Sequence, residues 1–214
     1  MSDIFREIDE ELRRENIRQL WSRFGKYIIG LAVLAVVATA GVMGWRQYQL
    51  HQRQAQGVNY VAALELARQG KNAEAGAAFA QLAKSASGGL AALAQLEAGA
   101  AKVQAGDTAG AIAAYDQLAA DGSADPVFRD IATLLAARYS LDKGDPHAVI
   151  AQLEPLTNAS NPWHGLAIEL RAVAELKAGD TAKARADFEA LTKDSTAPSG
   201  VRQRALEMQA ALAP

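Results

Sequence analysis

The chain contains no cysteine, which excludes disulfides, thiolate metal sites and thiol nucleophiles together. The same absence leaves the redox compartment undecided. Histidine is almost as scarce: His51, His147 and His164 lie far apart and never at the i, i+4 spacing of a helical metal site. We therefore expect surface or turn histidines and no metal centre.

Concentrated positive charge is also missing, since 22 Lys and Arg residues face 24 Asp and Glu residues for a net charge of −2. General nucleic-acid binding requires clustered cations facing phosphates, so no nucleic-acid partner is expected. The sequence has no glycine-rich phosphate loop, no nucleophile elbow and no close carboxylate pair beside an aromatic pocket. We therefore expect no catalytic residues and no cofactor, because an enzyme would have to assemble its site from isolated side chains.

Long β-branched runs are confined to residues 28–37, and alanine is the commonest residue. Alanine loses the least side-chain entropy in a helix, so an all-α fold is expected. The residues that follow position 45 are numerous enough to bury a core of their own.

One segment, 27–45, carries no formal charge and is bounded by Lys26 and Arg46. As a helix it would span roughly 28 Å, close to the hydrocarbon thickness of a bilayer. Tyr27 and Trp45 stand at its two ends, where amphipathic rings favour the headgroup boundary. The segment is predicted to be a transmembrane helix in contact with the lipid bilayer.

Two alternatives to an uncleaved anchor remain. Ala38-Thr39-Ala40 matches the small-x-small pattern of a signal-peptidase site, whose cleavage would release a soluble binding module. A buried core helix could be equally apolar. The anchor is favoured because the apolar run continues to Trp45 and because the preceding region is long and rich in acidic residues.

Flanking cations predict the orientation of this helix. More of them lie within twenty residues before the span than after it: Arg13, Arg14, Arg18, Arg23 and Lys26, against Arg46 and Arg53. The positive-inside rule then keeps residues 1–26 in the cytoplasm and exports the rest. No feature targets a eukaryotic organelle, so we expect a single-pass protein of the bacterial inner membrane with a periplasmic C-terminal domain.

The two segments beside the predicted span are expected to be helical as well. Residues 1–26 carry apolar side chains at steps of three or four, with one gap, at Phe5, Ile8, Leu12, Leu20, Trp21 and Phe24. Such an amphipathic tail either rests on the membrane surface, which is favoured, or binds a cytoplasmic partner. Residues 46–56 contain no helix breaker and are predicted to extend the membrane helix outward.

The exported part is repetitive. Four glycines recur at spacings of 36, 38 and 35 residues, and three are followed by aspartate: Gly70, Gly106-Asp107, Gly144-Asp145 and Gly179-Asp180. We expect each glycine to end one helix in the left-handed conformation and each aspartate to cap the next. In the first copy, Asn72 is the weaker equivalent of the cap.

These repeats predict helix pairs at 57–69 with 73–86, 89–105 with 108–120, 126–143 with 146–158, and 163–178 with 181–193, and a closing helix at 199–212. Pro155 is expected to kink or shorten the sixth predicted helix, at 146–158. Small residues recur seven positions before each glycine, at Ala63, Gly99, Ala137 and Ala172, and should let paired helices approach closely. Large residues recur nine positions after it, at Phe79, Tyr115, Leu153 and Phe188, and should fill the gap between successive pairs.

The predicted fold is thus a single N-terminal transmembrane helix followed by an α-solenoid of about four helix pairs plus a capping helix. Over residues 57–193 the pattern resembles the tetratricopeptide repeat, and the whole repeat domain is expected to cover 57–214. The surface that binds partners is not predicted. Trp163, at the start of the seventh helix, is a weak candidate anchor for a peptide, although a packing role at that helix start is favoured.

With the anchor and repeats placed, the chain resembles the ancillary subunit family of the bacterial SecYEG translocon. The likeness rests on Gly25-Lys26, on Gly44-Trp45-Arg46-Gln47-Tyr48 and on the Gly179-Asp180 turn before Ala184. It implies association with the translocon and with a membrane-tethered periplasmic chaperone, assisting newly exported proteins. Some members also connect to a stress regulator through a tail that is shorter than this one. The alternatives are a scaffold for outer-membrane or cell-wall assembly and the released soluble module.

Overall fold

The computed structural model describes residues 3–212, with side chains described throughout that range except at 3–25, 28 and 32. All regular structure in this range is helical, which confirms the all-α prediction. The elements are α1 (Asp3–Arg68), α2 (Asn72–Ser85), α3 (Gly89–Gln104), α4 (Thr108–Ala119), α5 (Pro126–Ser140), α6 (Pro146–Leu153), the 3-10 turn η1 (Glu154–Leu156), α7 (His164–Ala178), α8 (Thr181–Lys193) and α9 (Ser199–Ala211). They divide into two compact units, Met1–Ala55 and Gln56–Pro214.

The first unit is the N-terminal part of α1. Large apolar side chains between Tyr27 and Trp45 are exposed, Leu31 by 69%. In the described range, α1 is the one helix long and apolar enough to cross a membrane, within Ile29–Arg68. The hydroxyl of Thr39 donates to Ala35 O at 2.7 Å, so this polar group is satisfied inside the helix, as a bilayer would require. The apolar part of α1 fits either a membrane span or a signal anchor. The side chains of the predicted amphipathic tail, at Phe5, Ile8, Leu12, Leu20, Trp21 and Phe24, lie outside the described residues.

The second unit begins within α1. The predicted helix at 57–69 is the C-terminal part of this longer helix, because Gly57 causes no break. Gln56 Nε2 donates to Ser85 O at 3.0 Å and thereby connects this part to the end of α2. Ala63, Ala75 and Phe79 form a buried cluster with α3. The end of α1 is therefore the first helix of the first repeat.

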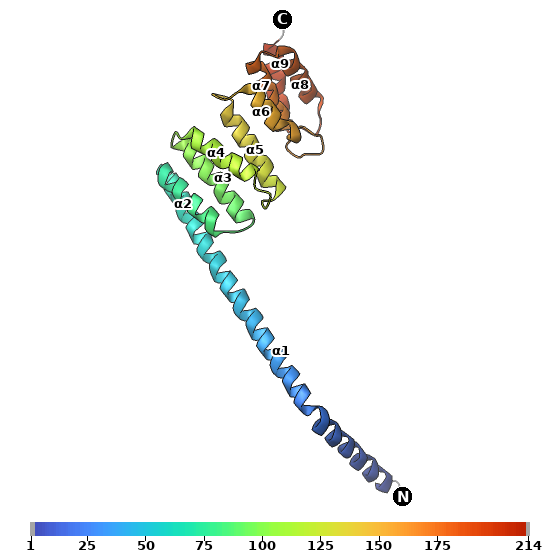
Figure 1. The fold of residues 1–214 in the computed structure, drawn as a ribbon. Helices are drawn as coiled ribbons and strands as arrows, with labels where there is room; N and C mark the ends of the chain where they lie inside the picture. Colours follow the sequence, from blue (N-terminus) through green and yellow to red (C-terminus); the bar gives the residue numbers. More distant parts are fainter. Residues whose placement is uncertain (1–2, 213–214) are drawn as a thin grey trace. The chain divides into compact units, whose positions relative to one another are not determined.

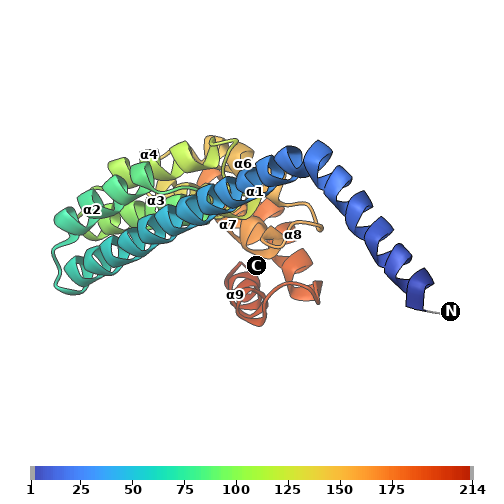
Figure 2. The same cartoon turned by 90° about the horizontal axis from the view of Figure 1, so that it is seen from below.

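The remaining helices follow one another through space in chain order, as Figure 1 shows. Within α2–α5 and within α6–α9, each helix packs against the next one in the chain. Contacts also join the first helices of successive pairs, from α3 to α5, from α5 to α7 and from α7 to α9. In Figure 2, α2, α4 and α6 lie along one edge of the stack. The first helices thus form one continuous row, and α9 follows α7 in that row as the capping helix.

The turns between paired helices show how glycine and aspartate act. Gly70, Gly106 and Gly179 have φ of +75°, +83° and +88°, a region that glycine adopts without a steric penalty. Asp107 accepts a hydrogen bond from Gly110 N at 2.9 Å, and Asp145 accepts one from His147 N at 3.0 Å. Both aspartates therefore satisfy backbone donors of the helix that follows.

Three turn residues differ from the sequence expectation. Gly144 lacks a positive φ; a Cβ there would lie 2.6 Å from Ser140 O, so glycine permits a close backbone approach instead. The side chain of Asp180 makes no cap hydrogen bond because it pairs with Lys183 Nζ at 2.8 Å. Asn72 is not a cap either, since it lies inside α2 and donates to Gln104 O at 3.3 Å.

The repeated small and large positions meet in the core. Tyr115 packs so closely on Gly99 that a Cβ at that glycine would lie 2.4 Å from the ring atom Cε1. Tyr115 also stacks on Tyr139, with 6.1 Å between the ring centroids. The sixth helix ends at Leu153 and continues only as η1, which confirms that Pro155 shortens it.

Candidate functional site

A groove of about 590 Å³ opens on the row of first helices, between α5, α7 and α9. Its walls are two stripes of mostly apolar side chains at helical spacing. One consists of Ile131, Leu134, Leu135 and Arg138 on α5, and the other of Leu166, Leu170 and Val173 on α7 together with Trp163, which immediately precedes α7. Residues three and four apart share one face of a helix, so each stripe turns a single face toward the groove. The groove is therefore an apolar surface that neighbouring helices leave uncovered.

The polar groups of the groove come from Arg138, Glu169 and Arg204. Arg204 Nε and Nη2 donate to the two carboxylate oxygens of Glu169 at 2.6 and 2.7 Å, which joins α9 to α7. This bidentate pairing raises the pKa of Arg204. Arg138 is exposed and makes no ion pair with any residue whose side chain the structure describes. The rim therefore carries two guanidinium groups: that of Arg204 is paired with a carboxylate, and that of Arg138 has no such partner among the described side chains.

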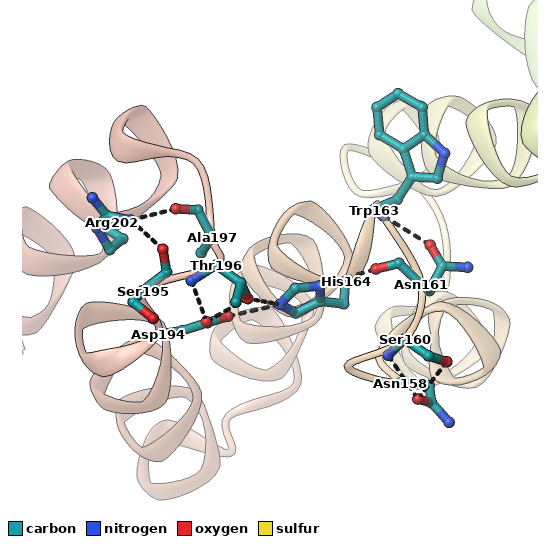
Figure 3. A network of polar contacts seen from close by, with 10 residues as sticks. All are labelled: Asn158, Ser160, Asn161, Trp163, His164, Asp194, Ser195, Thr196, Ala197 and Arg202. Carbon is teal, nitrogen blue, oxygen red and sulfur yellow. Dashed lines mark hydrogen bonds and ion pairs between the residues drawn. The ribbon is translucent and has the colours of Figure 1, made fainter.

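Trp163 occupies one end of this groove. Its ring packs against the core cluster of α5, α6 and α7, and its backbone N–H donates to Asn161 Oδ1 at 2.8 Å. Figure 3 shows the ring directed away from the neighbouring polar network. The indole Nε1 is buried and has no hydrogen-bond partner among the described residues. The Trp163 ring thus packs on the core and also lines the groove. Binding of a partner by Trp163 remains a prediction.

The polar network beside the groove centres on His164 (Figure 3). His164 Nδ1 lies 2.9 Å from Asn161 O and Nε2 lies 2.7 Å from Asp194 Oδ2. Both neighbours are acceptors, so both ring nitrogens donate and the imidazolium is the form that fits. The hydrogen bond to Asp194 raises the pKa of His164 against the opposing effect of burial. The hydroxyl of Thr196, with His164, holds the pKa of Asp194 far below its usual range.

The network has a structural rather than a proton-transfer geometry. Thr196 Oγ1 and Asp194 both lie at the same ring nitrogen of His164, so no nitrogen is left to act as a base toward the hydroxyl. Thr196 Oγ1 also donates to Asp194 Oδ1 at 2.6 Å. Arg202 then donates to Ala197 O at 2.5 Å, tying the same loop to α9. The network therefore fixes the start of α9, which supplies Arg204 to the groove.

A second ionic cluster connects α7 to α8 and η1. Arg171 binds both oxygens of Asp187 at 2.8 and 2.9 Å and Glu154 at 3.0 Å. Glu175 is buried on the same helix, and this burial, followed by the charge of Asp187, raises the pKa of Glu175. Within the described part of the chain, no three His, Asp or Glu side chains converge as metal ligands would.

The predicted membrane-boundary residues, Lys26, Tyr27, Trp45 and Arg46, are all exposed. Lys26 Nζ lies 5.2 Å from the centroid of the Tyr27 ring. At the other end the rings of Trp45 and Tyr48 are 6.3 Å apart. Each end thus combines a cation with an aromatic ring, the combination that favours the headgroup region.

Comparison with known families matches residues 18–211 to the tetratricopeptide repeat-like domain. No curated protein and no solved structure matches the chain. Domains of this kind are typically binding modules for other proteins rather than catalysts, and their stacked helix pairs provide extended binding surfaces. The matched region covers most of the sequence, and the chain therefore belongs to the tetratricopeptide repeat-like domain family.

Proposed function

We propose that this protein is a membrane-anchored periplasmic adaptor that associates with the SecYEG translocon and with a membrane-tethered periplasmic chaperone, and that assists newly exported proteins. The groove on α5, α7 and α9 carries this proposal, because a solvent-facing apolar surface of this size marks an interaction site. Its walls supply contact area for another chain. The function is therefore one of binding rather than of catalysis.

The membrane tether supports the location. The charge difference across the span favours a cytoplasmic N-terminus, and the exposed apolar part of α1 requires a lipid or protein cover. A tether also raises the effective concentration of the repeat domain near partners in the same membrane. The translocon and the chaperone enter through the resemblance carried by Gly25-Lys26 and by the residues from Gly44 to Tyr48.

Site-specific crosslinking in cells tests this proposal. A photo-crosslinking residue replaces Arg138 at the groove in one variant and the exposed Ala151 of α6 in a second. Recovery of translocon channel subunits or periplasmic chaperones from either position is the expected result. Crosslinks from both positions that contain only outer-membrane or cell-wall assembly proteins would overturn the translocon assignment and favour an assembly scaffold instead.

A further inference from the structure

The helix that opens the first repeat leaves an apolar side uncovered. Val58 and Val61, in the C-terminal part of α1, are 69% and 64% exposed. Five positions before the recurrent small residue, the later repeats have Ala94, Ala132 and Ala167 where the first has Val58, and all three alanines are buried. The outer face of a terminal repeat is typically polar, so exposed valines there indicate a surface that another chain covers. We propose that this side of α1 binds the same side of a second copy of this chain, as a parallel two-stranded coiled coil.

Heptad spacing gathers the exposed apolar residues of this region into one seam. When residues are counted in sevens with Val58 at position a, Val61 takes position d, and the exposed Tyr48 and Leu50 take the flanking positions e and g. The outward positions b, c and f from 46 to 59 are all polar: Arg46, Gln49, Gln52, Arg53, Gln56 and Asn59. Apolar residues confined to one side with a period of seven are the pattern of a coiled coil.

The polar residues of the seam suit a symmetric pair. Gln47, His51 and Gln54 take positions d, a and d before Val58. In a parallel pair about a two-fold axis, each of them faces its own counterpart. Amide and imidazole groups both donate and accept hydrogen bonds, so each can pair with its counterpart. Polar residues inside a coiled coil fix its register and its number of strands, although they lower its stability.

Charge complementarity identifies the occupant as a second copy. Glu65 and Arg68 take the next positions a and d; both are exposed, and neither makes an ion pair with a described side chain. In a parallel pair the d side chain of one helix packs beside the a side chain of the other, so Arg68 reaches Glu65 of the second copy, and the reverse. Arg46 and Arg53 would repel their counterparts, but they lie at position c, outside the seam.

The predicted membrane anchor favours the parallel arrangement. Two anchored copies enter the same membrane with the same orientation, which brings equivalent residues of α1 to the same height. Confinement to one membrane also raises the effective concentration of each copy for the other. Counting back in sevens from Val58 and Val61 reaches Gly44 and Ala40 in the span, where small residues let two helices approach closely. The inference therefore rests on the anchor but goes beyond the proposed adaptor function and is independent of the translocon.

Disulfide crosslinking of the full chain in its own membranes tests the inference, because the chain has no native cysteine. V58C and V61C each place a thiol in the seam. N59C is the matched control, since Asn59 is equally exposed but lies at the outward position b. Mild oxidation should convert most of V58C and V61C, and little of N59C, to a covalent dimer, because a disulfide requires Cα atoms within about 7 Å. Equal dimer yields from the three variants would overturn the inference, and so would a product whose mass is not that of two copies.

Charge reversal tests the ionic pairs in the V61C background. E65R and R68E each place like charges beside one another in the seam, so each should lower the initial rate of dimer formation about fivefold. The double variant E65R/R68E restores opposite charges and should recover the rate, whereas a merely structural role of either residue would give additive losses. Both side chains are exposed, so the melting temperature should not change. A double variant that crosslinks more slowly than either single variant would overturn the parallel pairing.

Discussion

Replacing Gly99 by alanine adds one methyl group where the buried ring of Tyr115 already lies. The new Cβ would stand 2.4 Å from Cε1 and 2.6 Å from Cζ of that ring, so the ring must move. Overpacking of this kind costs about 1–3 kcal/mol, whereas alanine gains about 1 kcal/mol over glycine in a helix interior. We expect a net loss of about 1 kcal/mol in the free energy of unfolding.

Gly76 provides the matched control, because it is also a buried helical glycine. A Cβ there would meet Ala101 Cβ at 3.5 Å, an ordinary van der Waals contact. Only the helix-propensity gain remains, so G76A should stabilise the domain by roughly 0.5–1 kcal/mol. The two identical substitutions are thus expected to have opposite signs.

The other repeats indicate how G99A can be rescued. Ala63 shares a buried cluster with Phe79, and Ala172 shares one with Phe188, so alanine tolerates phenylalanine at the corresponding positions. G99A/Y115F should therefore recover much of the stability lost in G99A. Thermal unfolding followed by circular dichroism measures each effect, at about 2–4 °C per kcal/mol for a chain of this size. A higher melting temperature for G99A than for wild type would refute the packing argument.

Two further perturbations concern the helix ends and the polar network. D145A removes a capping acceptor and should lower the free energy of unfolding by about 1 kcal/mol, as measured by thermal unfolding. D180A should lower it by less, because Asp180 pairs only with the exposed Lys183. Equal losses in the two variants would contradict the assignment of Asp145 as a cap. The raised pKa of His164 means that its contribution to stability is complete below the unfolded pKa and is lost as the pH rises through the folded value. Melting temperatures should therefore fall as the pH rises above about 6.5, the ordinary pKa of histidine, and through the raised pKa of the folded state. H164Q, which cannot pair with Asp194 as a cation, should flatten this dependence; an unchanged slope would show that His164 is not its source.

Helix boundaries of the repeat domain follow from local sequence. The glycines that adopt a positive φ, such as Gly106, mark a helix end by backbone sterics that one residue type relieves. The predicted boundaries consequently match the observed ones to within a few residues, except where α6 ends early, before Pro155, and where the predicted helix at 57–69 proves to be the end of the longer α1. A strong local signal is sufficient to predict such elements.

Features that depend on distant residues could not be predicted in this way. His164 was expected at a surface or a turn and is buried, because Asp194, thirty residues further along the chain, accepts its second N–H. The groove likewise depends on the convergence of three helix faces, and no single segment indicates that Arg204 reaches Glu169. The sequence signal for Trp163, an aromatic residue at a helix start, favoured packing over binding, and the structure places the ring both against the core cluster and at the groove.

Single-cysteine labelling tests the anchored topology most directly. The chain has no native cysteine, so S22C and A151C each introduce a unique thiol, one before the predicted span and one on the exposed surface of α6. A membrane-impermeant maleimide should label A151C in intact spheroplasts and S22C only after lysis, with both proteins in the membrane fraction. Labelling of S22C in intact spheroplasts, or a soluble A151C product that begins after Ala40, would contradict a membrane-tethered adaptor with an exported repeat domain.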